Sequence, residues 1–183
     1  MQLINCLINL FGKPQLHNLD IKHFELKTIL IHRSLLLEHE DVDVQRVHVI
    51  RNLIRSYGYV KYPILADVRT LTILDGHHRF RALLSMGLDY IPVFLVDYAK
   101  DYIEVSSWRK EFRVTKVEVI LRAISNSKYP PRTSRHILSG ITIPSTTVNI
   151  EELVNKPNPK YIVVERLQLN KPKNLNANVE YLK

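Results

Sequence analysis

Residues 73–82 read ILDGHHRFRA, and a single glycine in this stretch joins an apolar run to a helical pattern. The apolar residues before Asp75 predict a buried strand, and the spacing of the apolar residues after it predicts a helix over residues 77–86. The N–H groups in the first turn of a helix have no partners within the helix, so they bind anions. The stretch therefore predicts a phosphate-binding turn at Gly76.

The side chains of this turn suit the same chemistry. His77, His78 and Arg79 supply donors, and a guanidinium can bind phosphate through two parallel hydrogen bonds. Asp75 is unexpected beside an anion, and holding Mg²⁺ or contacting the nucleophile would explain it. An ordinary helix start, capped by Asp75 and with two exposed histidines, fits the same residues. Zinc is disfavoured because adjacent histidines point to different sides and no third ligand follows at a suitable spacing.

A carboxylate also stands before the next helical pattern upstream. His39 and Glu40 precede a helix predicted from Asp41 or Asp43 to Gly58, which is rich in arginine on its polar side. Glu40 could take a proton from a substrate hydroxyl, as a general base does. The alternative is that its charge only complements the start of the helix.

A third candidate segment lies near the C-terminal end. A polar loop after Pro131 gathers hydroxyl, guanidinium and imidazole groups that could clamp a phosphate, namely Arg132, Thr133, Ser134, Arg135 and His136. A basic surface loop is the plainer explanation of the same residues. Trp108, the single tryptophan, belongs either to the core or to the wall of a small-ligand pocket.

The remaining pattern predicts a mixed α/β domain of short strands and about three main helices. Strands are expected at 24–31, 63–68, 71–74, 91–96 and 104–108, a helix with a capping box at 115–125, and short elements at 148–154 and 161–169. The run at 3–11 is too short to span a membrane and is expected to pack on the domain. We predict a core over residues 1–126 and a C-terminal segment, 127–183, whose clamp loop packs on that core. The tail from Asn170 is expected to be mobile.

Composition sets limits on the function. The chain has 183 residues, 45% of them hydrophobic, which suits one globular domain. Its net charge of +8 favours an anionic partner, although a solvated basic surface is an equal explanation. The single cysteine, Cys6, excludes a disulfide framework within the chain and favours a reducing, cytoplasmic setting.

The three segments together resemble a known family. Gly76-x-x-Arg79-x-x-Ala82 resembles the G-x-x-R-x-x-A box of the ParB/sulfiredoxin superfamily. His77 stands where sulfiredoxin has its reactive cysteine, and the residues after the box do not resemble the helical DNA-binding module of ParB. The order and spacing of all the blocks, roughly from Phe24 to Val154, are similar to those of the free L-serine kinases.

The resemblance implies transfer of the terminal phosphoryl group of a nucleotide to free L-serine, giving O-phospho-L-serine for cysteine synthesis. ATP is the expected donor and ADP the alternative, because the chain lacks an insertion between Ser125 and Pro130 found in longer, ADP-using members. Glu40 and Asp75 are the expected catalytic residues, with Asp75 also holding Mg²⁺. His39 and Trp108 are expected to bind the amino acid. Nucleotide phosphates are assigned to Gly76, His77, His78, Arg79, Thr133, Ser134, Arg135 and His136.

No membrane partner is expected, and the chain is expected to be a monomer or a small homo-oligomer. The rival interpretation is a ParB-like regulator that binds nucleotide or DNA without kinase activity. A nuclease is a weaker third possibility, because Asp75 and Glu40 alone would make a thin acidic metal site.

Overall fold

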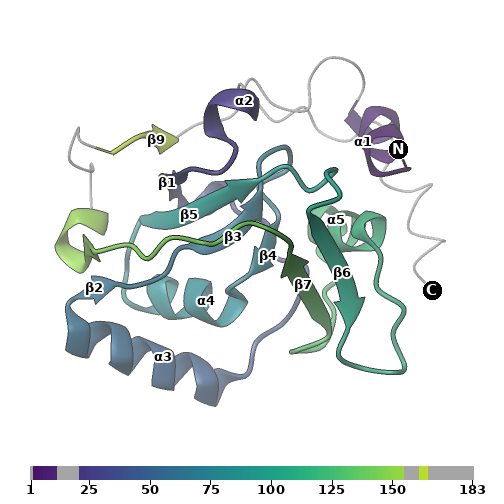
Figure 1. The fold of residues 1–183 in the computed structure, drawn as a ribbon. Helices are drawn as coiled ribbons and strands as arrows, with labels where there is room; N and C mark the ends of the chain where they lie inside the picture. Colours follow the sequence, from purple (N-terminus) through teal and green to yellow (C-terminus); the bar gives the residue numbers. More distant parts are fainter. Residues whose placement is uncertain (1, 12–20, 155–160, 165–183) are drawn as a thin grey trace.

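A computed structural model describes residues 2–11, 21–154 and 161–164 (Figure 1). The main sheet has five strands in the order β4-β3-β5-β1-β9. Their bounds are Thr28–His32 (β1), Ile64–Asp67 (β3), Ile73–Asp75 (β4), Tyr90–Val96 (β5) and Val163–Val164 (β9). β3 and β5 run parallel, as do β1 and β9, whereas the β1–β5 and β3–β4 pairs are antiparallel. The expected mixed α/β fold is confirmed, with β5 buried along its whole length.

Helices cover both faces of this sheet. The helices are Gln2–Phe11 (α1), Ile21–Phe24 (α2), Val44–Tyr57 (α3), His77–Ser85 (α4) and Lys116–Ser125 (α5). α3 and α4 lie side by side on one face (Figure 1), where they pack on Ile64, Ala66 and Val93. Because side chains alternate along a strand, the neighbouring Leu65 and Phe94 face the other side and pack with α1 and α5. None of the helices in the described ranges is long and apolar enough to cross a membrane.

The helix boundaries follow the local signals. Asp43 caps α3 by accepting hydrogen bonds from the backbone of its first turn, and Gly58 ends it with a left-handed φ of 73°. Thr115 and Glu118 form the capping box expected at the start of α5. The N-terminal apolar run forms α1, and its Leu3 and Leu7 pack into the core as expected.

Two small sheets complete the described structure. β6 (Ile103–Ser107) pairs antiparallel with β7 (Ser134–Leu138), and β2 (Tyr59–Val60) pairs with β8 (Val148–Asn149). Two 3-10 turns lie at Arg33–Leu35 and Ile150–Leu153. Strands β7, β8 and β9 thus all come from beyond residue 126 and pair with strands that precede it.

Two sequence-based boundaries need correction. The strand expected at 24–31 begins only at Thr28, because Phe24 ends α2 and Leu26 has a φ of 60° that no strand contains. The polar loop expected at 132–136 is largely strand β7, because pairing with β6 compensates for its lack of alternating apolar residues. The element expected at 161–169 is seen as β9, and its residues after 164 lie outside the described ranges, as does the tail from Asn170.

Candidate functional site

Glu40 is held in place by the backbone of a distant segment. It lies in a short strand-like pairing with Tyr129, which brings it to residues 132–134. Its Oε2 accepts hydrogen bonds from the N–H groups of Thr133 (3.1 Å) and Ser134 (2.8 Å) and from the Ser134 hydroxyl (2.8 Å). Its Oε1 accepts one, at 2.7 Å, from the N–H of Arg132. Three successive backbone donors therefore surround one carboxylate that is only 6% exposed.

Arg132 has the backbone conformation that makes this arrangement possible. Its φ of 58° is left-handed, which turns successive N–H groups toward one point. Among the described residues Oε1 accepts only this one hydrogen bond, although a carboxylate oxygen has two lone pairs. Glu40 therefore keeps a lone pair available for a further donor.

His39 lies behind Glu40 and is completely buried. Its Nδ1 is 2.8 Å from the carbonyl oxygen of Ile73, and its Nε2 is 2.8 Å from the hydroxyl oxygen of Ser134. Burial lowers the pKa of His39 to about 4, although the hydrogen bond to Ile73 opposes the shift. The sequence assigned His39 to substrate binding, whereas the structure places it beneath the surface of the site.

The predicted anion turn is formed as expected in its backbone. β4 ends at Asp75, Gly76 has a φ of 100°, and α4 begins at His77 without a side-chain cap. A Cβ atom on Gly76 would lie 3.2 Å from Nη1 of Arg79 and 3.3 Å from Cγ1 of Ile64. Glycine is therefore required both by the backbone conformation and by the crowding around it.

The two histidines of the turn have different surroundings. His77 is 5% exposed, and its Nε2 has no hydrogen-bond partner among the described residues. Burial, followed by the charges of His39 and His136, lowers its pKa well below 6.5. His78 accepts a hydrogen bond of 3.1 Å at Nε2 from the backbone of Asp43, and burial, then Arg46, lowers its pKa. Both rings are therefore neutral at pH 7.

These elements meet in one polar pocket of about 220 Å³. Its lining residues are Glu40, Arg46, Leu74, Asp75, Gly76, His77, His78, Trp108, Arg132 and Ser134. Trp108 follows β6, is 61% exposed, and has the Arg135 guanidinium 4.3 Å from its ring centroid. Residues from the three predicted segments thus line one cavity.

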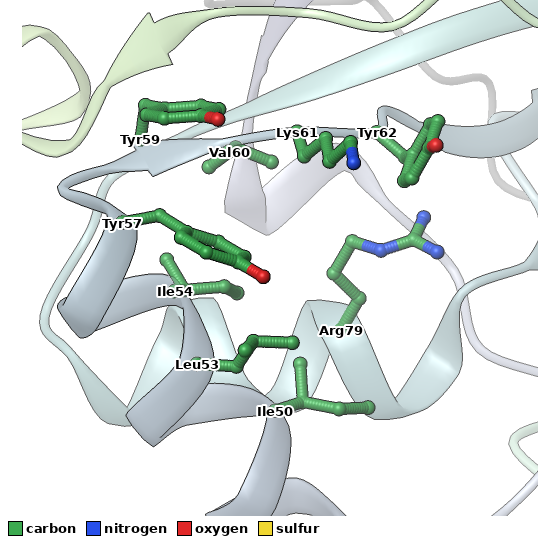
Figure 2. Close-up of a pocket in the computed structure, with 9 residues that line it drawn as sticks. All are labelled: Ile50, Leu53, Ile54, Tyr57, Tyr59, Val60, Lys61, Tyr62 and Arg79. Carbon is green, nitrogen blue, oxygen red and sulfur yellow. The ribbon is translucent and has the colours of Figure 1, made fainter.

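Arg79 is separated from this pocket. Its Nη1 donates a 2.6 Å hydrogen bond to the carbonyl oxygen of Pro63, and its side chain lines a second, mostly apolar pocket of about 300 Å³ (Figure 2). Ile50, Leu53, Ile54, Tyr57, Tyr59, Val60, Lys61 and Tyr62 complete that lining. The two pockets are neighbours, because Arg46 and Ile50 stand one turn apart on α3.

Thr133 and His136 also point away from the polar pocket. The Thr133 hydroxyl donates to the carbonyl oxygen of Pro130 at 2.7 Å, and the residue is fully buried. Nε2 of His136 is 2.7 Å from the hydroxyl of Tyr98, and burial, then His39, lowers the pKa of His136 well below 6.5. In this conformation both side chains support the site from within.

Sequence comparison relates the chain to archaeal kinases over part of its length. No protein-family model matches it. It is 30% identical over 94 residues to the ATP-dependent L-serine kinase of Staphylothermus marinus, which covers 49% of this chain and 36% of that protein. It is 25% identical over 115 residues to the ADP-dependent L-serine kinase SerK of Thermococcus kodakarensis, and the alignment covers 61% of this chain and 48% of that protein. A ParB-like protein of Sulfolobus acidocaldarius is 39% identical over 75 residues, covering 41% and 37%. The matches thus span between about a third and a half of these relatives.

Solved structures extend the likeness to most of the described fold. A free serine kinase in complex with AMP superposes with a TM-score of 0.64 at 16% identity, over 70% of this chain and 94% of that one. The chain has the free serine kinase fold. SbnI with a C-terminal truncation, from Staphylococcus aureus, superposes with a TM-score of 0.62 at 13% identity, over 77% and 93%. The resemblance inferred from the sequence is thereby confirmed.

Within this free serine kinase fold, sequence reasoning missed one cation of the polar pocket. Arg46 lines the pocket, but it was assigned no role. It is in the first turn of α3, off its apolar stripe, which was the available signal. Arg132, which the sequence placed in the phosphate clamp, also lines the pocket.

The pocket provides a limited set of metal ligands. The described residues contain no group of three or more His, Cys, Asp or Glu side chains arranged to hold a metal ion. Asp75 is exposed at the end of β4 and lines the pocket. One carboxylate fits the usual protein share of a Mg²⁺ site, in which phosphates and water supply the other ligands.

Proposed function

We propose that this chain is a nucleotide-dependent kinase of free L-serine. It would transfer the terminal phosphoryl group of a nucleotide to the serine hydroxyl, giving O-phospho-L-serine, a precursor for cysteine synthesis. The observation that carries the proposal is that Glu40 and the turn at Gly76 line one polar pocket. A base and an anion site side by side are the parts that phosphoryl transfer to an alcohol needs. The similarity to L-serine kinases supports the choice of substrate.

Glu40 is the proposed general base. Its carboxylate is fixed by four hydrogen bonds, and Oε1 retains a lone pair for the substrate hydroxyl. The N–H groups at the start of α4, together with Arg46 and Arg132, would neutralise the transferring phosphoryl group. Asp75 would hold Mg²⁺, which neutralises phosphate charge when bound. Trp108 would form the wall against which the amino acid lies.

The apolar pocket suits the base of the nucleotide. Its aliphatic and tyrosine side chains offer a slot for a flat ring, whereas the polar pocket has only the exposed Trp108 (Figure 2). Arg79 lies between this slot and Gly76, and its only hydrogen bond among the described residues is to Pro63. Its remaining N–H groups can bind the phosphates that lead from the base to the turn. ATP is the favoured donor, since the relative with 30% identity uses ATP.

The test is formation of O-phosphoserine from L-serine, Mg²⁺ and either ATP or ADP. We expect product with ATP and a loss of kcat of about 10²- to 10⁴-fold in Glu40→Gln, because the base is removed while the shape is kept. Glu104→Gln, an exposed change on β6, is the matched control and should retain kcat. No product with either nucleotide would exclude the kinase.

A second candidate is a ParB-like regulator that binds nucleotide or DNA. The 39% identity to a ParB-like protein and the net charge of +8 favour it. It predicts DNA binding that weakens steeply between low and moderate salt, because phosphate contacts release counterions. Salt-sensitive DNA binding without phosphoserine would select this function.

A further inference from the structure

Glu38 carries a charge that the proposed reaction does not use. It lies two residues before Glu40, and its side chain is 9% exposed. Its Oε1 accepts a 2.8 Å hydrogen bond from Nε of Arg81, and its Oε2 lies 2.5 Å from Nη2 of the same guanidinium. Nζ of Lys128 donates to Oε2 as well, at 3.0 Å. Glu38 thus stands between two cations, and it lines neither of the two pockets described above.

The two cations belong to separate parts of the proposed active site. Arg81 is on α4, whose N-terminus forms the anion turn. Lys128 begins the segment that leads to the cradle of Glu40, which consists of the three backbone N–H groups of residues 132–134. The Glu38 carboxylate therefore connects the helix of the anion turn to the segment that holds the base.

The geometry of these contacts restricts movement between the two parts. Arg81 binds both oxygens of Glu38 through two N–H groups of one planar guanidinium, so the contact fixes an orientation as well as a distance. The Lys128 side chain is only 15% exposed, so salt screens its attraction to Glu38 less than it screens a pair at the surface. The two contacts together hold α4 and the cradle segment in one relative position.

We infer that the triad of Glu38, Arg81 and Lys128 positions the general base against the anion turn. This role rests on the proposed kinase function. Phosphoryl transfer requires the base, the serine hydroxyl and the phosphoryl group to stand in one geometry, and a misplacement of about 1 Å can cost about 100-fold in rate. Glu38 is thus a positioning residue that acts through the segments it connects.

Two variants of opposite charge test the triad. We expect Glu38→Gln and Lys128→Met each to lower kcat about 10- to 100-fold, because each breaks the connection between the two segments. The KM values for serine and nucleotide should change less than about twofold, since every residue that lines the two pockets is kept. An unchanged kcat in both variants would overturn the inference.

The opposite charges also exclude an effect through the electric field. Burial lowers the pKa of His77, and the charge of Lys128 adds to this shift, so the triad is close enough for its field to reach the polar pocket. A field effect would change kcat in opposite directions when Glu38 or Lys128 is neutralised. Such opposite changes would overturn the inference, whereas losses in both variants support it.

A milder variant tests the paired hydrogen bonds. Arg81→Lys keeps the positive charge but replaces two fixed donors by a point charge, so kcat should fall about three- to tenfold. Arg81 is 41% exposed, so this change leaves the fold intact. Full activity would contradict the role of the guanidinium. Glu111→Gln, which removes one partner of the exposed pair with Arg109, is the control and should leave kcat unchanged.

Hydrogen exchange provides a readout that needs no turnover. In Glu38→Gln the N–H groups of Arg132, Thr133 and Ser134 should exchange about tenfold faster or more, while those of β5 keep their wild-type rates. The same acceleration in β5 would show that Glu38 only stabilises the fold, and unchanged exchange in the cradle would show that Glu38 does not hold it. Either result would overturn the inference. If the cradle alone exchanges faster but wild type makes no phosphoserine, the connection stands and the proposed function is excluded.

Discussion

Acid should destabilise this protein through His39, and the size of the effect follows from its burial. The pKa of His39 is about 4 in the folded chain and about 6.5 when unfolded. The unfolded state therefore binds one more proton between these values, so the stability is fully present above about pH 6.5 and is lost as pH falls toward 4. Integration gives a loss of about 2.5 kcal/mol between pH 7 and pH 4.5. His77 and His136, whose pKa values are lowered in the same direction, add to this loss.

The assay is urea unfolding of wild type and His39→Gln over this pH range. Carboxylates also titrate in acid, so the informative quantity is the difference between the two proteins. The variant should lose about 2.5 kcal/mol less than wild type on going from pH 7 to pH 4.5. His48→Gln, an exposed histidine on α3, should follow the wild-type curve. Parallel curves for wild type and His39→Gln would refute the buried neutral histidine.

Three further predictions concern the two pockets. Gly76→Ala should lower the free energy of unfolding by about 1–2 kcal/mol more than Gly58→Ala, because the Cβ added at Gly58 meets open space. Calorimetry of both variants measures the difference, and equal losses of stability would show that crowding at Gly76 is absent. Arg79→Lys should raise the KM for nucleotide about tenfold, because paired donors become a point charge, and leave the KM for serine unchanged; the reverse pattern would place Arg79 at the amino acid. Trp108→Ala should raise the KM for serine and leave the free energy of unfolding nearly unchanged, since Trp108 is 61% exposed. A large loss of stability would instead show that Trp108 belongs to the core.

Local signals explain how much of the fold could be predicted. The caps at Asp43 and Gly58 and the capping box at Thr115 each lie within a few residues of the helix that they bound. β5 was evident because residues 91–96 are an unbroken apolar run, the pattern of a strand that is buried on both faces, as the structure finds for β5. The glycine turn at Gly76 was equally clear, since strand, glycine and helix follow one another directly.

The parts that were not predicted depend on contacts between distant residues. The backbone donors to Glu40 lie 92 to 94 residues further along the chain, so the sequence around Glu40 gives no indication of them. The strand at β7 forms only because β6 is its partner. The direction of the Arg79 side chain depends on the carbonyl group of Pro63, 16 residues earlier, so sequence spacing could not reveal it.

The cradle of Glu40 has a consequence for sequence variation. Three of the four groups that bind this carboxylate are backbone N–H groups, which every amino acid except proline provides. Homologous chains can therefore exchange the side chain at position 132 and keep the cradle, with glycine or asparagine favoured by its left-handed φ. Proline at position 132, 133 or 134 would remove one donor outright. An alignment of homologues should therefore lack proline at positions 132, 133 and 134 and keep glutamate at position 40.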